Sequence, residues 1–480
     1  MKRHITVTYV QNKVAPRHAL NSDMRCVLVF LLHLYAYNTK ERKMKKVRTH
    51  IAKIQSGEKI TIAGHVQTIR VQSSVAFIII RDITGTIQCV IEKTHPQFEI
   101  AKTISVESVL EITGVAMETP SVKSGIEIHI ETITVLSAAE QLPIQITGKG
   151  SETVSSEVAQ DWRFLTLRRE RDATIMKTLS AITTGYREAL LPIGFTEIFT
   201  PKLMGTPSES HAELFKIEYF GGTAYLAQSA QLYKQMAIAS GLERVFEVSP
   251  TFRADPSFTT RHATEFITLE CEMGYIESFD EVMETLERAI AYMLTAARKA
   301  CGAEIKKHFG VEGFQLKRSI PRITMHQAKK ILAGMGVTSE KADLSPAEER
   351  AICEYVEKEI GSEFVYITEY PWESRPFYHK KGISSETGKP ISVSADLLYK
   401  GIELTTLAQR EEHYKTLCEQ CAEKGLKQEG LQWYLDCFRF GMPPHGGWGM
   451  GSERFVKQLL GLPSLREAQF LFRGPTRLMP

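Results

Sequence analysis

The chain has 480 residues, of which 43% are hydrophobic and 24% are charged. This composition excludes a disordered chain, a collagen and a small disulfide-stapled fold, and the length predicts two or three domains. Lys and Arg number 59 against 56 Asp and Glu, so the net charge is +3. Because so small a charge gives little bulk attraction for a polyanion, any nucleic acid would have to meet local basic clusters.

The first 43 residues contain one apolar segment, Cys26–Tyr37, between Arg25 and Lys40. It is shorter than the roughly 20 residues that a spanning helix needs, and no small-residue cleavage site follows it. We interpret residues 1–43 as an extension of unknown role, with an organelle-targeting or membrane-contacting segment as the alternative. We expect no stable membrane association.

Of the eight cysteines, only Cys418 and Cys421 form a C-x-x-C pair, and no second pair stands near them at zinc spacing. Their surroundings, KTLCEQCAEKG, predict an amphipathic helix. We therefore interpret both as structural thiols, with a metal or redox role as the alternative. A reduced, cytoplasmic protein is the simplest inference from this cysteine usage.

Short β-rich runs begin at Gly57, starting with KITIAGHVQTIR and SVAFIIIRD, and turn signals separate them. Five such runs before any strong helix predict a small closed barrel over residues 44–137. An oligonucleotide-binding (OB) barrel is the leading candidate, and another five-stranded barrel is the alternative. Residues 138–156 contain Pro, Gly and small polar residues and predict a linker or hinge.

Residues 157–480 predict a large α+β domain. Helical periodicity extends from Glu157 to Leu190, and β-runs then alternate with further helical segments. These helices are expected over residues 231–241, 279–300, 346–360 and 408–424.

Two arginines, a histidine and an aromatic residue lie at the ends of two consecutive β-runs: Arg253, Arg261, His262 and Phe266. An antiparallel hairpin would bring both ends of the intervening loop side by side. Guanidinium groups match phosphate oxygens well, and Phe266 could stack on a base. The chain has no P-loop and no G-x-G-x-x-G pattern after a strand, so any nucleotide would be bound differently. A solvated sheet edge is the alternative.

Gly447, Gly449 and Gly451 alternate along an extended stretch that leads into a helix, with Arg454 in its first turn. Absent side chains let a flat ligand approach the backbone, and a helix start favours anions. A tight strand–helix packing corner is the alternative.

The segments FRAD, RHATEF and GGWGMGSER resemble motifs 2 and 3 of the class II aminoacyl-tRNA synthetases, and GFTEIFTP (194–201) resembles motif 1. Their order behind an N-terminal barrel is similar to the aspartate, asparagine and lysine subgroup over residues 45–480. The segments LAQSAQLYKQ, RPFY, GIELTTLAQR and GMPPHGG are similar to aspartyl-tRNA synthetases of the archaeal and eukaryotic type. The resemblance implies an OB-fold barrel that binds the anticodon and an antiparallel-sheet catalytic domain over 157–480. It also implies a homodimer, because the motif 1 proline lies at the dimer interface in this class.

The resemblance implies an aspartate–tRNA ligase with ATP as a substrate. The aspartate carboxylate would attack the α-phosphorus and release pyrophosphate, and the terminal ribose hydroxyl of the tRNA would then attack the aspartyl-adenylate. Positioning and charge neutralisation would do most of the catalysis. Arg253 matches the arginine on the α-phosphate, and Arg261 and His262 match the γ-phosphate side. Asp255, where Glu is usual, belongs to the same implied ATP site.

Phe266 and Arg454 match the two faces that sandwich adenine, so Arg454 joins Arg253 as an expected catalytic position. Glu403 and Thr406 match the positions that bind Mg²⁺. A carboxylate and a hydroxyl suit a hard cation that keeps some of its waters.

For the amino acid, Lys234 and Arg410 match the two positions that bind the substrate carboxylate. A buried cation without an anion is costly, so neutral asparagine should be disfavoured. Glu270 stands where the family usually places Asp to hold the substrate ammonium, and asparaginyl enzymes commonly have Glu there. The remaining matched positions are Ser229 and Gln231 around the substrate, and Ser208 and Glu209 in a loop that closes over it. Ser210 and His211 replace the usual Gly-Gly of that loop.

In the barrel, Arg70, Phe77 and Gln88 match three anticodon-binding positions. Phe77 could stack on an unpaired base, with a core aromatic as the alternative. His65 stands where many archaeal enzymes selective for aspartate tRNA carry Trp. We therefore predict that the chain accepts tRNA(Asn) as well as tRNA(Asp).

Three other functions are open. An asparaginyl-tRNA synthetase is favoured by Glu270 and opposed by Lys234 and Arg410. A tRNA-independent paralogue that makes asparagine from ammonia is opposed by the predicted barrel. A non-catalytic nucleic-acid-binding protein on a synthetase scaffold is opposed by Arg253, Arg454 and Glu403.

Overall fold

The computed structural model describes residues 48–122, 124–147, 154–206, 214–256, 259–316, 318–339 and 341–480. The predicted extension (1–43) and the predicted loop residues Ser208 and Glu209 lie outside this part of the chain. The chain divides into two compact units between Pro143 and Ile144. Each unit is described by itself.

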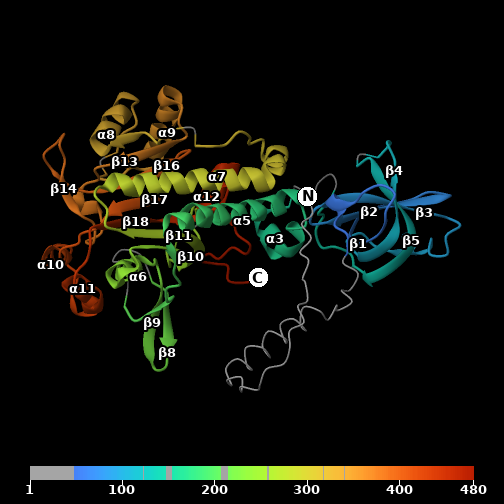
Figure 1. Ribbon diagram of the computed structural model, residues 1–480, viewed down its shortest axis with the longest axis horizontal. Coiled ribbons are helices and arrows are strands. Elements are labelled where there is room, and N and C mark those ends of the chain that lie inside the picture. The colour runs from blue at the N-terminus through green and yellow to red at the C-terminus, as the bar shows by residue number, and fades with distance from the viewer. Residues whose placement is uncertain are drawn as a thin grey trace, which may run out of the picture. The chain divides into compact units, whose positions relative to one another are not determined.

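The N-terminal unit is a closed barrel in its described part (Figure 1), with the strand order β1-β2-β3-β5-β4. The strands are β1 (Lys59–Val71), β2 (Val75–Asp82), β3 (Gly85–Glu92), β4 (Val109–Glu118) and β5 (Ile126–Ser137), with the short helices η1 (Ile51–Lys53) and α2 (Ile100–Thr103). Alternate side chains such as Ile62, Ile78 and Ile112 fill the interior. The predicted five-stranded barrel is therefore confirmed.

Two glycines allow the barrel strands to approach closely. A Cβ at Gly64 would lie 2.3 Å from the carbonyl oxygen of Arg81, and one at Gly114 would lie 2.2 Å from that of His129. Both glycines interrupt otherwise β-favouring runs, because no larger residue would fit between the strands there.

The C-terminal unit is built on a mixed sheet whose described strands follow the order β12-β13-β16-β17-β18-β11-β10-β6. The strands are β12 (Arg322–Thr324), β13 (Phe364–Thr368), β16 (Ser394–Tyr399), β17 (Ile402–Gln409), β18 (His445–Gly451), β11 (Glu265–Gly274), β10 (Arg244–Phe252) and β6 (Thr196–Glu197). Pairs from β13 to β10 are antiparallel, and only the two edge pairs are parallel. This sheet confirms the predicted α+β fold class.

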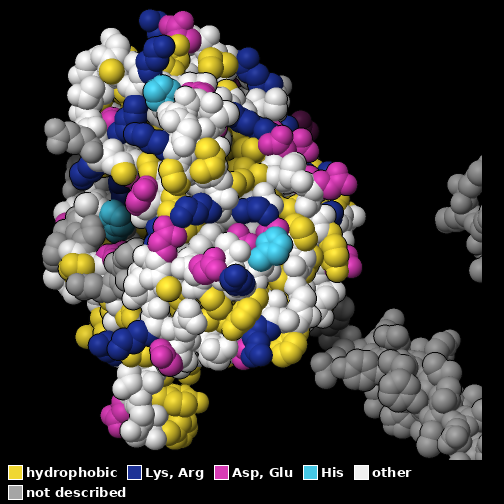
Figure 2. Space-filling model, turned by 90° about the vertical axis from the view of Figure 1, so that its left-hand side faces the viewer, with side chains coloured by type: hydrophobic (Ala, Val, Ile, Leu, Met, Phe, Trp, Pro, Cys, Tyr) yellow, Lys and Arg dark blue, Asp and Glu magenta, His cyan; other side chains and the backbone are white. Residues whose placement is uncertain are grey.

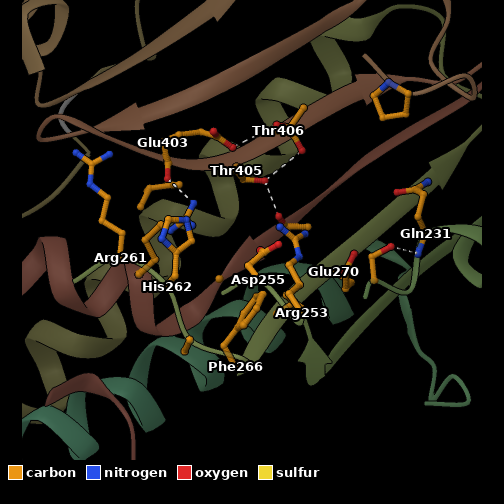
Figure 3. Close-up of a pocket in the computed structure, with 18 of the residues that line it drawn as sticks. Gln231, Arg253, Asp255, Arg261, His262, Phe266, Glu270, Glu403, Thr405 and Thr406 are labelled. Carbon is orange, nitrogen blue, oxygen red and sulfur yellow. Dashed lines mark hydrogen bonds between the residues drawn. The ribbon is translucent and has the colours of Figure 1, made fainter. Parts of the chain in front are cut away.

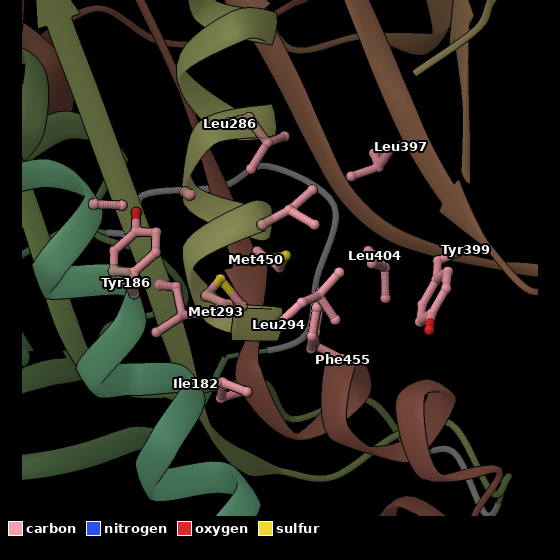
Figure 4. Packing of buried hydrophobic residues seen from close by; sticks show 14 of the residues in the cluster. Ile182, Tyr186, Leu286, Met293, Leu294, Leu397, Tyr399, Leu404, Met450 and Phe455 are labelled. Atoms are coloured by element: carbon pink, nitrogen blue, oxygen red, sulfur yellow. The ribbon is translucent and has the colours of Figure 1, made fainter. Parts of the chain in front are cut away.

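Two long helices, α5 (Glu170–Leu190) and α7 (Phe279–Phe309), lie side by side across one face of this sheet (Figure 1). Figure 4 shows their side chains, such as Tyr186 and Met293, packed against Leu404 and Met450 from the strands. Phe455 from α12 (Ser452–Leu460) closes the same core. Because α5 and α7 cover only one face, the opposite face of the central strands is available for a binding site.

The other described elements surround this frame. The small sheets contain β7 (Leu203–Met204), β9 (Gly222–Leu226) and β8 (Lys216–Tyr219), and β14 (Lys381–Ile383) with β15 (Pro390–Ser392). The helices are α3 (Ser156–Asp161), α4 (Arg163–Thr166), α6 (Gln231–Ala237), α8 (Met325–Gly334), α9 (Pro346–Ile360), α10 (Tyr414–Glu423), α11 (Gln432–Arg439) and α13 (Leu465–Ala468), with the short turns η2 (Leu191–Ile193), η3 (Ile238–Leu242), η4 (Trp372–Ser374) and η5 (Glu429–Leu431). Among the described helices, none is long and apolar enough to cross a membrane.

The face shown in Figure 2 carries basic and acidic side chains that are interspersed, in line with the small net charge. The hairpin of β8 and β9 protrudes at its lower end, where apolar side chains are exposed. Phe220 at the turn of this hairpin is 95% exposed.

Several predicted helices differ from the observed ones. The helix predicted from Glu157 to Leu190 is interrupted at Trp162, where the backbone leaves helical geometry, and again before α5. The helix predicted over residues 408–424 is wrong at its start. There β17 extends to Gln409, and the backbone N–H of Arg410 still bonds to His445 of β18 at 2.8 Å. The helix predicted over residues 346–360 is confirmed by α9.

The C-x-x-C pair lies on α10, as predicted. Cys421 is buried beside Leu417, Cys418 is partly buried, and both are free thiols. Within the described residues, the one group of three His, Cys, Asp or Glu side chains with metal-ligand geometry is Glu411, Glu412 and His413, and it contains neither cysteine.

Candidate active site

A pocket of about 320 Å³ opens on the sheet face away from α5 and α7. Most of the predicted substrate and ATP residues line it: Ser229, Gln231, Arg253, Asp255, Arg261, His262, Phe266, Glu270, Glu403, Thr406, Arg410 and Arg454. Figure 3 shows that the pocket has two ends, with Arg261 and His262 at one and Gln231 at the other. The strand period of two explains this placement, since Leu269, Cys271 and Met273 of β11 enter the core while Thr268 and Glu270 face the pocket.

The predicted hairpin is confirmed by β10 and β11, which pair in antiparallel register from Arg244 opposite Met273 to Phe252 opposite Glu265. Beyond the strands, the backbone N–H of Arg253 bonds to the Thr264 carbonyl at 3.0 Å. The guanidinium carbon of Arg253 lies 5.7 Å from the centre of the Phe266 ring. A cation and an aromatic face therefore stand together at one wall of the pocket.

The alternating glycines lie on β18, directly before α12, as expected, and Gly449 and Gly451 line the pocket, where close approach of a ligand stays a prediction. A Cβ at Gly449 would lie 2.8 Å from Oε2 of Glu270, and one at Gly447 would lie 2.6 Å from Oε2 of Glu272. These glycines leave room for carboxylates on the neighbouring strand. Gly451 has space around it, 3.7 Å or more from Arg454 and Phe266.

Lys234 is fully buried and lies behind the pocket wall. Its ammonium is 2.7 Å from Oε2 of Glu270, and it donates to the carbonyls of Cys271 (3.1 Å) and Trp448 (2.8 Å). Glu272 is its second carboxylate, at 3.5 Å. Every proton of this ammonium therefore has an acceptor within the protein.

Arg410 binds the Glu272 carboxylate from the side opposite Lys234. Its Nε donates to Glu272 at 2.9 Å, and its Nη2 donates to Gln231 at 3.0 Å and to the Gly447 carbonyl at 3.1 Å. Burial raises the pKa of Glu272, but Arg410 and Lys234 outweigh burial and hold it below its ordinary value. The two predicted cations thus converge on one ionised acid.

Glu272 is absent from our sequence prediction. A signal existed: Glu270 and Glu272 are acids two residues apart in an otherwise apolar run, so they share one face of a strand. Gln231 belongs to the same network, since its Nε2 donates to Glu272 at 3.2 Å and its backbone N–H donates to Ser229 Oγ at 3.1 Å.

At the other end, Glu403 and Thr406 lie together on β17, with 3.3 Å between Oε1 and Oγ1. Burial and the nearby Asp396 raise the pKa of Glu403 to about 7. Asp396, on the adjacent strand β16, pairs with Arg375 at 2.6 Å, while its Oδ1 is buried without a partner among the described residues. A buried aspartate with one unpartnered carboxylate oxygen, a partly buried glutamate and a hydroxyl fit a hard cation such as Mg²⁺.

Asp396 is a second acid that our sequence reasoning missed. It interrupts the buried run SADLLY and stands opposite Thr406 in the β16–β17 pairing. A buried aspartate within a strand was the available signal, but the register that brings it beside Glu403 is not readable from the sequence.

The arginines at the Arg261 end of the pocket are also held in place by contacts within the protein. Arg454 is partly buried and donates to the Glu403 carbonyl at 2.9 Å, and Arg261 pairs with Glu349 at 3.2 Å. Burial, followed by the charge of Arg454, lowers the pKa of His262.

In the barrel unit, Arg70, Phe77 and Gln88 lie on the consecutive strands β1, β2 and β3. The guanidinium carbon of Arg70 lies 5.0 Å from the centre of the Phe77 ring, and Gln88 donates to Glu127 at 2.8 Å. Phe77 is partly exposed between the buried Ala76 and Ile78. His65 lies on β1 opposite Arg81.

Two protein families match this chain. The family described as tRNA synthetases class II (D, K and N) matches residues 155–473, and the OB-fold nucleic acid binding domain matches residues 60–136. The chain therefore belongs to the class II tRNA synthetases of the aspartate, lysine and asparagine group, and the predicted resemblance is confirmed.

Individual proteins of this family are also similar to the chain. The chain is 39% identical to the aspartate–tRNA(Asp/Asn) ligase of Aeropyrum pernix, over 88% of this chain and 96% of that protein. It is 38% identical to the aspartate–tRNA(Asp) ligase of Pyrococcus abyssi, over 90% and 100%. Among solved structures, asparaginyl-tRNA synthetase from Pyrococcus horikoshii complexed with asparaginyl-adenylate has a TM-score of 0.82 at 32% identity, over 91% of this chain and 100% of that one. Aspartyl tRNA synthetase from Entamoeba histolytica has a TM-score of 0.80 at 28% identity, over 100% of both chains.

Proposed function

We propose that the chain is an aspartate–tRNA ligase, which activates L-aspartate with ATP and transfers it to the 3′-terminal adenosine of tRNA(Asp). The observation that carries this proposal is the meeting of Lys234 and Arg410 at one buried acid beside a pocket with an arginine-rich end. The similarity to aspartate–tRNA ligases over about nine-tenths of the chain supports it.

The nucleotide would occupy the end of the pocket with Arg253 and Phe266. Arg253 would neutralise charge at the α-phosphate, and Arg261 and His262 would bind on the γ-phosphate side. Phe266 and Arg454 hold the two faces of adenine. Because there is little covalent work for the protein, the in-line attack of the substrate carboxylate depends on orientation and on these fixed charges.

Glu403 and Thr406, with Asp396, would hold Mg²⁺, which supplies charge neutralisation for the departing pyrophosphate. Asp255 faces the same pocket and contributes negative charge near Arg253 and His262.

The aspartate would occupy the other end, between Ser229, Gln231 and Glu270. The two cations and two acids of this end are already balanced, so the side-chain carboxylate of the substrate must compete with Glu270 for Lys234 or bind Arg410. Ser208 and Glu209 would close over the substrate. In the second step, we propose that the α-phosphate takes the proton of the ribose hydroxyl.

Arg70, Phe77 and Gln88 would bind the anticodon bases by stacking and by bonds to base edges. His65 supports acceptance of tRNA(Asn) in addition to tRNA(Asp), and one relative is a ligase for both. We also propose a homodimer through the segment around Pro201, and a cytoplasmic location in line with the free cysteines.

One observation favours a second candidate, an asparagine–tRNA ligase. Glu270 neutralises Lys234, which would suit an uncharged substrate side chain, and the P. horikoshii enzyme that shares the fold is an asparaginyl-tRNA synthetase. A non-catalytic tRNA-binding paralogue is the third alternative.

Pyrophosphate exchange with aspartate and with asparagine, followed by charging of both tRNAs, tests all of these functions. Aspartate-dependent exchange supports the proposal, asparagine-dependent exchange supports the second candidate, and no exchange with either supports the non-catalytic paralogue. Charging of tRNA(Asn) no higher than background would refute the wider tRNA range.

A further inference from the structure

Helix α9 brings one carboxylate to the back of the nucleotide end of the pocket. Oε2 of Glu349 lies 3.2 Å from Nη1 of Arg261, and the two side chains are only 13% and 22% exposed. Arg261 lines the pocket, and Glu349 stands behind it. This pair links α9 to the loop between β10 and β11.

The first turn of α9 is fixed independently of this pair. Ser345 and Glu348 form a capping box, and Glu348 also binds Lys329 at 2.7 Å and Ser339 at 2.6 Å. Burial works against ionisation of Glu348, but these partners hold its pKa at about 2. These contacts of Glu348 fix the backbone of the turn from which the next residue, Glu349, reaches Arg261.

Glu349 interacts with other groups of the site in addition to Arg261. Burial raises its pKa, while Arg261, the backbone N–H of Glu403 and the charge of Arg454 act in the opposite direction. It therefore stands among a cation of the loop, the strand that carries the expected Mg²⁺ position and a cation of α12. None of the three sequence motifs includes this residue.

The geometry leaves Arg261 able to bind phosphate. Only Nη1 faces Glu349, and the other guanidinium nitrogens have no partner among the described residues. An arginine that is held at one nitrogen loses less conformational freedom when a phosphate binds the others.

We propose that Glu349 is a positioning residue for ATP, which orders Arg261 toward the end of the triphosphate and so couples α9 to nucleotide binding. This inference rests on the proposed function for the identity of the nucleotide. Glu349 does not touch the substrate in this account and acts through Arg261.

The test is Glu349→Gln in the full chain, with Glu354→Gln on the exposed side of α9 as the matched control. We expect KM for ATP in pyrophosphate exchange to rise about fivefold, from the lost ordering of one long side chain. We expect kcat to stay within about twofold and KM for aspartate to stay unchanged, because neither depends on how well the Arg261 side chain is ordered. Calorimetric titration with Mg²⁺-ATP should show the same rise in Kd, and E354Q should match the wild type.

Two further variants make the test specific. Glu349→Asp keeps the negative charge on a side chain that is one methylene shorter, so its KM for ATP should lie between those of the wild type and E349Q. If E349Q folds poorly, E349D provides the test in its place. In an Arg261→Ala background, E349Q should have no further effect on Kd, since the two residues act as a unit. The inference would be overturned if E349Q left the Kd for Mg²⁺-ATP unchanged or lowered it. It would also be overturned if E349Q raised this Kd as much in the R261A background as in the wild type. Absence of exchange in the wild type would instead refute the proposed function, and the ATP titration would still test Glu349.

Discussion

The ammonium of Lys234 and the carboxylate of Glu270 lie 2.7 Å apart, and neither is open to solvent. Glu272 and Arg410 complete a balanced set of two cations and two acids. Such a set is stable only while each charge keeps its partner, because an unpaired charge in the interior is costly. The choice between aspartate and asparagine therefore depends on how firmly Glu270 holds Lys234.

Shortening Glu270 should change this choice. In Glu270→Asp the carboxylate is pulled back by one methylene and releases Lys234 for the substrate. We expect the preference for aspartate over asparagine, as a ratio of kcat/KM in pyrophosphate exchange, to rise about tenfold. Glu265→Asp, on the exposed end of the same strand, should leave the ratio unchanged. A fall in the ratio would contradict this role for Glu270.

Gly449 should be intolerant of a side chain. A Cβ there would lie 2.8 and 2.9 Å from the two carboxylate oxygens of Glu270 and would push them from Lys234. We expect Gly449→Ala to lower the free energy of unfolding by about 1–3 kcal/mol and to reduce exchange strongly. Gly430→Ala is the control, since its nearest neighbour would be 3.9 Å away. Denaturant unfolding measures the first effect, and wild-type stability in G449A would be evidence against the close contact.

The sheet and much of the site follow from the sequence for definite reasons. The period of two in the β-runs predicts the β10–β11 hairpin and the glycine face of β18, and the resemblance supplies Lys234 and Arg410. Glu272 and Asp396 are missed because each is a buried acid whose partners lie on other strands, and pairing across a sheet is not readable from one strand. The helix predicted from residue 408 begins too early in the prediction, because pairing with β18 keeps the backbone extended through Arg410.

Glu403 should give stability a pH dependence. Its pKa is raised from 4.5 to about 7 in the folded chain, so between these values the folded state holds more protons than the unfolded state. The contribution of Glu403 to the free energy of unfolding therefore falls as pH rises through this window. Glu403→Gln should remove that slope. Denaturant unfolding at several pH values measures it, with Glu354→Gln as the control, and an unchanged slope in E403Q would contradict the assignment.

The same group should make Mg²⁺ binding depend on pH. A carboxylate must be ionised to bind the cation, so Mg²⁺ should raise Tm more at pH 8 than at pH 6. E403Q should lose this difference. An equal Mg²⁺ effect in E403Q and the wild type would place the cation elsewhere.

Phe77 should matter for tRNA and not for adenylate formation. Loss of a stacked base costs about 1–3 kcal/mol of binding, so Phe77→Ala should weaken tRNA(Asp) binding about 5- to 150-fold. Exchange without tRNA should be unchanged. Ile83→Ala, on the exposed β2–β3 turn, is the control, and filter binding provides the measurement. Full affinity in F77A would show that this ring does not stack on the anticodon.

The most direct test of the account is ATP–pyrophosphate exchange by the purified full chain with aspartate and with asparagine at equal concentrations. The pocket with Lys234 and Arg410 predicts a kcat/KM for aspartate at least about a hundredfold higher, because the aspartate carboxylate can bind Arg410 or compete with Glu270 for Lys234, and the neutral amide of asparagine cannot. Exchange that is equal for the two amino acids, or faster with asparagine, would contradict it.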